Sequence, residues 1–303
     1  MELLSYTETP IQEIEEPFLE EAGVRLLIKR EDQSHPLVSG NKWWKLKYNL
    51  LEAIKEKKET LLTFGGAFSN HIFATAAAAN ELGIKSIGII RGEEKAPLNP
   101  TLAFAKENGM QLKYVSRENY RQKTDADFIE KLREEFGDFY LIPEGGTNGL
   151  ALKGCEEFAR QILAKIDFDY LCLPVGTGGT MAGIIEGLKD KKKVMGFSVL
   201  KGGEFLEEEV NRFLQNRRVV TLTHWQLEHR FHFGGYGKTT ATLNQFMSSQ
   251  MERHRLPLDH VYTAKMLFGV LKMIAEGSFK KSTTIMVLHT GGLQSRAHAI
   301  SPV

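Results

Sequence analysis

The sequence predicts an α/β protein with two open, twisted, mostly parallel sheets that carry helices on both faces. Three observations lead to this fold class. Short apolar runs alternate with helical stretches after residue 60, as they do in α/β layers. Four of these runs end in glycine-rich turns that lead toward helices. The runs also form two groups, one before about residue 145 and one after about residue 169, which indicates two sheets with a ligand cleft between them.

The expected strands are short apolar runs, and the expected helices place apolar residues three and four positions apart. In chain order, the strands cover residues 24–30, 60–64, 85–90, 111–115, 138–142, 169–175, 193–199, 218–222 and 284–288. The helices cover residues 43–54, 69–82, 150–165, 180–188 and 263–276. Residues 224–232 are polar and aromatic, and we expect them to be irregular.

Composition and charge exclude several classes of protein. Lysine and arginine number 39 and aspartate and glutamate 38, so the net charge of +1 gives no reason to expect nucleic acid or an anionic membrane. The acidic N-terminal stretch lacks the order of a signal peptide, and the uncharged residues 61–80 are interrupted by glycine and polar residues. We therefore expect a cytoplasmic protein with neither a nucleic-acid nor a membrane partner.

The cysteines and histidines predict no metal site. Cys155 and Cys172 lack metal-ligand spacing and fall in a helical and a strand-like pattern, which is typical of buried free thiols in a reducing cytosol. His224, His229 and His232 are close in sequence but do not complete a regular set of zinc ligands. We assign these histidines to a loop or to the core.

The glycine-rich turns indicate anion recognition. They lie at residues 65–71, 144–149, 176–180 and 289–292. Glycine lets backbone amides approach a ligand closely, and the free amides at a helix start favour phosphate or carboxylate. One such turn is routine, whereas four indicate a site.

The turn that begins at Gly176 follows an apolar run and precedes a helix, which is the place of a phosphate cradle. A dinucleotide motif would need glycine where Met181 stands, and the next strand ends without the acid that holds a ribose. The sequence therefore favours a single phosphate monoester over NAD as the ligand of this turn. The alternative is that the glycines only tighten the turn and bind no ligand.

Residues 233–239 end like the phosphate loop of NTPases, but His232 replaces its first glycine, which disfavours nucleotide hydrolysis.

Lys42 is the candidate nucleophile. It follows Ser39, Gly40 and Asn41 at the start of a helical stretch. We expect Asn41 to cap this helix, which places Lys42 in the first turn, where the positive end of the helix dipole disfavours the ammonium form. A lysine so placed can act as a nucleophilic amine, although a solvated lysine is the alternative. Together with a phosphate cradle and the hydroxyl of Thr290, it predicts a receptor for pyridoxal phosphate.

Five motifs in register carry a family resemblance. They are residues 28–32 with Gly40-Asn41-Lys42, then Gly65-Gly66-x-x-Ser69-Asn70-His71, Gly176-Thr177-Gly178-Gly179-Thr180, Val261-Tyr262-Thr263-x-Lys265 and His289-Thr290-Gly291-Gly292. The chain resembles the 1-aminocyclopropane-1-carboxylate deaminase and D-cysteine desulfhydrase family of pyridoxal phosphate enzymes. The resemblance implies the tryptophan synthase β-like fold (fold type II) and a homodimer. It also implies a larger cofactor domain, residues 1–45 and 159–303, and a smaller α/β domain, residues 46–158.

The resemblance implies that Lys42 forms the Schiff base with the cofactor and that Asn70 contacts the ring hydroxyl. Thr290 would face the pyridine nitrogen. The phosphate would be bound by the residues of one turn, Gly176, Thr177, Gly178, Gly179 and Thr180.

The resemblance also assigns residues to a small amino-acid substrate. Ser69, Asn70 and His71 would bind its carboxylate, and Ser69 is a candidate for proton transfer. Tyr236 and Tyr262 would line the substrate side of the ring and take part in catalysis, with Thr263 as a further substrate contact.

One departure from the family bears on the reaction. Thr263 follows Tyr262, as in the desulfhydrase-like branch, where the deaminase branch has glutamate. The missing carboxylate would remove a polar partner for opening a cyclopropane ring. We therefore expect α,β-elimination of D-cysteine to pyruvate, ammonia and sulfide. The alternatives are 1-aminocyclopropane-1-carboxylate deamination and a cofactor-binding homologue without turnover.

Bulky residues form a second departure. Trp43 and Trp44 replace the usual threonine and arginine after the lysine, Phe68 replaces a usual glutamine, and Ile72 and Phe73 stand where smaller or basic residues are common. Such residues either narrow the site or repack a domain face. We expect repacking.

Overall fold

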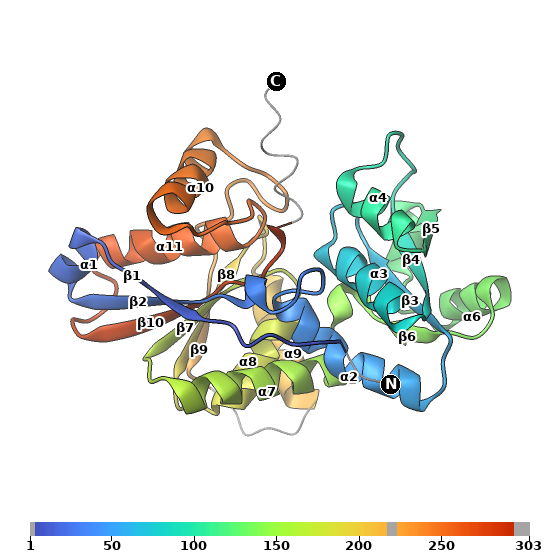
Figure 1. The fold of residues 1–303 in the computed structure, drawn as a ribbon, viewed down its shortest axis with the longest axis horizontal. Helices are drawn as coiled ribbons and strands as arrows, with labels where there is room; N and C mark the ends of the chain where they lie inside the picture. The colour runs from blue at the N-terminus through green and yellow to red at the C-terminus, as the bar shows by residue number, and fades with distance from the viewer. Residues whose placement is uncertain (1–3, 217–222, 294–303) are drawn as a thin grey trace.

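Two sheets organise the computed structural model, which describes residues 4–216 and 223–293 (Figure 1). The larger sheet has the order β1-β2-β10-β7-β8-β9. Its strands are β1 (Ile11–Ile14), β2 (Val24–Lys29), β7 (Tyr170–Val175), β8 (Lys193–Ser198), β9 (Trp225–Glu228) and β10 (Thr283–Leu288). All of its strand pairs are parallel except β1 with β2.

The smaller sheet is entirely parallel and has the order β5-β4-β3-β6. Its strands are β3 (Thr60–Gly65), β4 (Lys85–Arg91), β5 (Met110–Val115) and β6 (Tyr140–Ile142). Apolar clusters lie on both faces of this sheet. One cluster includes α3 (Asn70–Leu82) and α4 (Pro100–Glu107), and the other includes α5 (Arg117–Arg121) and α6 (Ala126–Phe136).

Helices also cover both faces of the larger sheet (Figure 1). One face carries α2 (Asn41–Lys55), α7 (Gly149–Lys165), α8 (Gly179–Leu188) and α9 (Phe205–Asn216). The other carries α1 (Pro17–Ala22), α10 (Ala241–His254) and α11 (Thr263–Ala275). Two short 3-10 turns are η1 (Glu31–Gln33) and η2 (Glu144–Gly146). The predicted fold class is therefore confirmed.

Glycines bring α2, α7 and α8 into close contact. A Cβ built on Gly154 of α7 would lie 1.9 Å from the carbonyl oxygen of Trp44 in α2. A Cβ on Gly183 of α8 would lie 2.6 Å from the carbonyl oxygen of Leu152 in α7. Side chains at these positions would force the helices apart. This packing holds the start of α2, with Lys42, near the start of α8.

Most of the expected strands are present. Two strands were not expected: β1, and β9, which lies within the segment predicted to be irregular. Both are edge strands of four residues with a polar residue at their centre, so neither shows a continuous apolar run. The expected strand at residues 218–222 lies outside the described residues. The domain boundaries stay a prediction.

The structure also bears on the predictions for the cysteines and for membrane spans. Cys155 and Cys172 are free and buried, as predicted. Within residues 4–216 and 223–293, no helix is both long and apolar enough to cross a bilayer.

Candidate functional site

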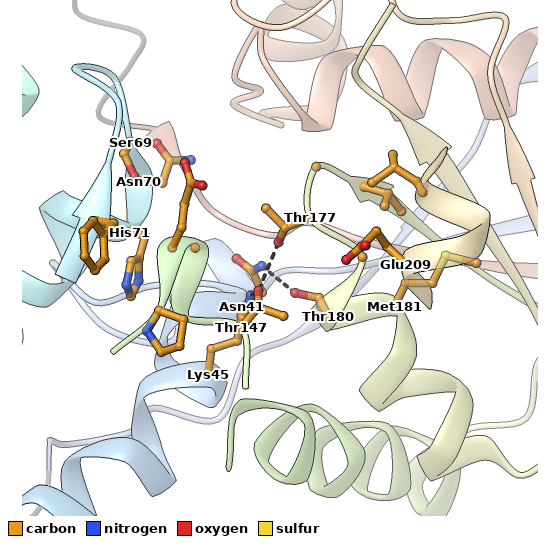
Figure 2. A pocket seen from close by; sticks show the side chains of 18 of the residues that line it. Asn41, Lys45, Ser69, Asn70, His71, Thr147, Thr177, Thr180, Met181 and Glu209 are labelled. Carbon is orange, nitrogen blue, oxygen red and sulfur yellow. Dashed lines mark hydrogen bonds between the residues drawn. The ribbon is translucent and has the colours of Figure 1, made fainter. Parts of the chain in front are cut away.

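A cavity of about 870 Å³ lies where the ends of strands from both sheets meet. Most of the predicted site residues line it: Lys42, Ser69, Asn70, His71, Gly176, Thr177, Gly178, Thr180, Tyr236, Tyr262 and Thr290. Figure 2 shows Ser69, Asn70 and His71 on one side, and Thr177 and Thr180 on the other. Because carboxyl ends of parallel strands gather at one sheet edge, segments far apart in sequence converge here.

Lys42 is the second residue of α2, and its Nζ lies 3.5 Å from the carbonyl oxygen of Gly145. The amine faces the cavity rather than bulk water. Burial lowers the pKa of Lys42 to about 8, because the charged form is poorly solvated there. A large fraction of this amine is therefore neutral near pH 8, which a nucleophile or base requires.

The predicted cap of α2 is wrong. Asn41 is the first helical residue, and Gly40 is the N-cap, with a φ of 69°. A Cβ on Gly40 would lie 2.0 Å from the carbonyl oxygen of Thr290, so only glycine lets this turn rest against the segment after β10. The side-chain amide Nδ2 of Asn41 instead donates a hydrogen bond of 2.9 Å to Oγ1 of Thr180 in α8 (Figure 2).

The start of α8 has the form of an anion cradle. Gly178 is its N-cap in the left-handed region, and within the described residues no side chain accepts from its first-turn amides. All ten residues of α8 are buried. These amides and the helix dipole favour a bound anion. Gly179 does not line the cavity, because its backbone packs on Thr147: a Cβ there would lie 2.3 Å from Thr147 Cγ2.

Lys45 is a site residue that the sequence analysis missed. It lies one turn after Lys42, is 1% exposed, and donates a hydrogen bond of 2.7 Å from Nζ to Oγ1 of Thr147. Oγ1 of Thr147 lies 3.1 Å from Oγ1 of Thr177 in the glycine-rich turn (Figure 2). Burial, with the charge of Lys42, lowers the pKa of Lys45 well below its ordinary value. The three-residue spacing from Lys42, which puts both amines on one helix face, was the available signal.

Helix α3 begins at the opposite wall. Ser69 is its N-cap, and the Ser69 hydroxyl accepts a hydrogen bond of 3.3 Å from the backbone N–H of Ile72. A Cβ on Gly292 would lie 2.4 Å from Nδ2 of Asn70, so this glycine makes room for the Asn70 amide. The predicted roles of Ser69 and Asn70 remain predictions, and their positions allow them.

His71 is 1% exposed, and its Nε2 lies 2.8 Å from Oγ1 of Thr63. The Thr63 hydroxyl donates to the carbonyl oxygen of Ile142, which leaves Nε2 of His71 as the donor toward Thr63. Burial lowers the pKa of His71 well below its ordinary value, and Lys42 and Lys45 add to this effect. The ring is therefore neutral, and a substrate carboxylate would meet the backbone N–H of His71 rather than its ring.

Tyr236 and Tyr262 meet edge to face with ring centroids 6.0 Å apart. Burial raises the pKa of both hydroxyls, so both stay protonated at neutral pH.

Thr263 is fully buried, and its hydroxyl donates a hydrogen bond of 2.7 Å to Oδ1 of Asp259. Thr263 does not line the cavity, and its predicted contact with substrate stays a prediction.

Most of the bulky residues pack inside the protein, as expected, but Phe68 is 50% exposed. Trp43 and Trp44 are buried, and their indole N–H groups donate to Ser5 O at 2.9 Å and to Glu31 Oε2 at 2.8 Å. The ring of Phe73 stacks on Phe104 at 3.8 Å. None of these residues lines the cavity, and neither do Ile72 and Phe68.

Comparisons with known proteins agree with this geometry. A family model described as "Pyridoxal-phosphate dependent enzyme" matches residues 3–291. The chain is 31% identical to a "Putative 1-aminocyclopropane-1-carboxylate deaminase" of Thermotoga maritima, over 96% of this chain and 95% of the relative. It is 31% identical to a "Bifunctional D-cysteine desulfhydrase/1-aminocyclopropane-1-carboxylate deaminase, mitochondrial" of Arabidopsis thaliana, over 96% of this chain and 77% of the relative.

Solved structures give the same picture. A crystal structure described as an "ACC deaminase homologue" superposes with a TM-score of 0.85 at 29% identity, covering 97% of this chain and 92% of the other. An O-ureido-L-serine synthase shares the fold, with a TM-score of 0.72 at 14% identity, over 98% of this chain and 92% of the other.

Proposed function

Since the chain belongs to the family of pyridoxal-phosphate dependent enzymes, we propose that it converts a small amino acid to a 2-oxo acid and ammonia. The favoured reaction is α,β-elimination of D-cysteine, which with one water gives pyruvate, ammonia and sulfide. The observation that carries the proposal is the Lys42 amine in one cavity with the uncapped start of α8. Threonine replaces the glutamate of the deaminase branch at position 263, so the carboxylate expected beside Tyr262 for opening a cyclopropane ring is missing, although Thr263 itself is hydrogen-bonded to Asp259 outside the cavity wall.

The cavity residues fit the family's cofactor. Pyridoxal phosphate requires an amine for its aldehyde and donors for its phosphate. Lys42 would supply the amine, and the Gly176 turn with the first-turn amides of α8 would hold the phosphate. Asn70 would meet the ring hydroxyl and Thr290 the ring nitrogen. When bound, the cofactor supplies an aldehyde that reacts with amines and a ring that accepts the electron pair released at the substrate Cα.

The chain's own residues then bind substrate and move protons. The neutral Lys42 amine takes the proton from the substrate Cα, a role that its lowered pKa permits. The start of α3 holds the α-carboxylate through the Ser69 hydroxyl and backbone N–H groups. Tyr236 lies at the cavity wall with a protonated hydroxyl that can donate to the departing sulfur. The Thr290 hydroxyl carries no charge, which favours elimination over chemistry that needs a permanently protonated ring nitrogen.

An absorbance spectrum of the purified protein, followed by substrate assays, tests the proposal. D-cysteine, L-cysteine, D-serine and 1-aminocyclopropane-1-carboxylate are added in turn while 2-oxo acid and sulfide are measured. We expect a cofactor band and turnover of D-cysteine. Turnover of the cyclopropane substrate instead would establish deamination, and a colourless protein that cannot be reconstituted would overturn the proposal.

Lys42→Ala should abolish covalent attachment of the cofactor. Lys55→Ala is the matched control, because Lys55 belongs to the same helix and its side chain is 74% exposed. A cofactor band that survives borohydride reduction and denaturation in Lys42→Ala would contradict the assignment of the nucleophile.

The hypothesis of a cofactor-binding homologue without turnover depended on bulky residues in the pocket. Trp43, Trp44 and Phe68 do not line the cavity, so nothing in the packing favours that alternative. A homodimer and a cytoplasmic location stay predictions. Light scattering on the holoenzyme would test the first.

A further inference from the structure

Of the charged side chains that the structure describes on the cavity wall, some lie beside an opposite charge, and others do not. They are Lys42, Lys45, Arg91, Lys123, Glu144, Glu209 and Arg212. Each acid has a cationic neighbour: Glu144 lies 3.4 Å from Lys123, and Glu209 lies 2.5 Å from Arg212. Lys42 and Lys45 belong to the proposed cofactor end. Arg91 is the remaining cation of the wall.

Arg91 stands at the substrate end. It is the last residue of β4, which pairs with β3, and β3 leads into the turn that ends at Ser69. Nη2 of Arg91 lies 3.5 Å from the position that a Cβ on Gly66 would take, so the guanidinium lies over this turn. This turn, residues 66–69, connects directly to the start of α3, where the α-carboxylate of the substrate is expected.

The contacts of Arg91 leave its charge uncompensated. Its Cζ lies 5.5 Å from the ring centroid of Tyr120, and within residues 4–216 and 223–293 no carboxylate lies within ion-pair distance of it. The Tyr120 hydroxyl donates a hydrogen bond of 2.8 Å to Oε1 of Glu144, which fixes the ring beneath the guanidinium. Arg91 is exposed to the cavity and positioned by this stacking contact.

We infer that Arg91 is a specificity residue for substrates whose side chain carries an anionic group at or beyond Cβ. A guanidinium pairs with carboxylate or phosphate through two parallel hydrogen bonds, which makes it selective for such groups. The start of α3 already provides donors for the α-carboxylate, so Arg91 is left for a second anion. This inference rests on the proposed conversion of a small amino acid to a 2-oxo acid, and it extends the substrates from D-cysteine to amino acids with an anionic side chain.

The same chemistry accommodates such a substrate. With O-phosphoserine, the Cα proton is removed, the Cβ–O bond breaks, and the bonding pair leaves with the phosphate. The remaining three-carbon enamine takes up one water and gives pyruvate and ammonia. One phosphoserine and one water thus yield one pyruvate, one ammonia and one phosphate, with no oxidant or reductant.

Calorimetric titration of the holoenzyme tests the inference without relying on turnover. Aspartate and asparagine, each as both enantiomers, differ only in the side-chain anion. We expect one enantiomer of aspartate to bind at least tenfold more tightly than the matching asparagine. Arg91→Gln should remove this preference while asparagine affinity changes less than twofold, and Arg91→Lys should restore part of it. Arg117→Gln, an exposed residue of α5 outside the cavity wall, should leave the preference intact.

The inference is overturned if the wild-type holoenzyme does not distinguish aspartate from asparagine. It is also overturned if Arg91→Gln weakens both ligands equally, because Arg91 would then hold the α-carboxylate or support the fold. The cofactor band separates this failure from that of the proposed function. A protein without the band refutes the proposed function, whereas a normal band without preference refutes the inference alone. Elimination of phosphate from O-phosphoserine, with serine as the neutral comparison, gives a second readout.

Discussion

Nζ of Lys45 donates a hydrogen bond of 2.7 Å to Oγ1 of Thr147, and this contact joins helix α2 to the segment that precedes α7. Thr147 in turn lies 3.1 Å from Thr177 of the proposed phosphate turn. The two lysines of α2 therefore serve different parts of the cavity. Lys42 lines it with its amine, and Lys45 supports the wall that would hold the anion.

Replacement of Lys45 by methionine should weaken cofactor binding. The change removes the donor that holds Thr147 beside the anion cradle, so we expect the dissociation constant of pyridoxal phosphate to rise at least tenfold. The apoprotein should keep its stability, because the buried amine of Lys45 carries a desolvation cost that methionine, with a similar size, does not. Equilibrium dialysis and urea unfolding measure the two quantities. Lys55→Met is the control, and unchanged cofactor affinity in Lys45→Met would refute this role.

Replacement of Gly40 by alanine should destabilise the fold. Its φ of 69° is costly for an L-residue, and the added Cβ would lie 2.0 Å from the Thr290 carbonyl oxygen. Gly137 has nearly the same backbone conformation, with φ 76° and ψ −152° against φ 69° and ψ −148° at Gly40, and no neighbouring atom within 4 Å of the added Cβ, so Gly137→Ala isolates the conformational cost. We expect Gly40→Ala to lose about 1–3 kcal/mol more free energy of unfolding than Gly137→Ala, as in other overpacked sites. Equal losses in urea unfolding would show that the turn can shift.

The interior strands could be predicted from sequence because buried parallel strands are continuous apolar runs. β3 and β7 are examples, with five of six residues buried in each. β1 and β9 escaped prediction because each is paired on one side only and mixes polar with apolar residues. Each forms only because it pairs with another strand, β1 with β2 and β9 with β8.

The site was predictable where function depends on local sequence. Lys42 and the Gly176 turn carry local signals, since each lies at a helix start. The cap of α2 was misassigned because the steric demand on Gly40 comes from Thr290, which is far away in sequence. The sequence around Arg91 gives no sign of a site. Arg91 reaches the cavity because β4 pairs with β3, and within the described part of the chain it is left without an ion pair because Glu144 and Glu209 lie beside other cations.

Attachment of the cofactor to the apoprotein should follow the ionisation of Lys42. The folded-state pKa of about 8 lies below the ordinary value of 10.5, so the neutral amine becomes more abundant as pH rises through about 8 and changes little above about 9. The attachment rate should increase severalfold from pH 7 to pH 8 and level off above pH 9. Stopped-flow absorbance measures it. A rate that keeps rising tenfold per unit to pH 10 would mean that the amine is not desolvated.

Lys265 positions the loop that carries Tyr236. It is 1% exposed and donates a hydrogen bond of 2.7 Å from Nζ to the carbonyl oxygen of Gly235, the residue before Tyr236. Phe233, Gly234, Gly235 and Gly237 all have positive φ, so the loop has an unusual backbone path that needs an anchor. Loss of the anchor should let Tyr236 move away from Tyr262.

Lys265→Met should therefore lower kcat/KM by about tenfold or more while the cofactor stays bound, since the change removes one charged hydrogen bond and not the cradle. Limited proteolysis should cut the Gly235 loop faster in the variant, which a change in Tyr236 chemistry alone would not produce. Lys272→Met, on the same helix with its side chain 55% exposed, should match the wild type in both assays. Faster cleavage with unchanged kcat/KM would show that the anchor holds the loop but that the position of Tyr236 does not limit the reaction.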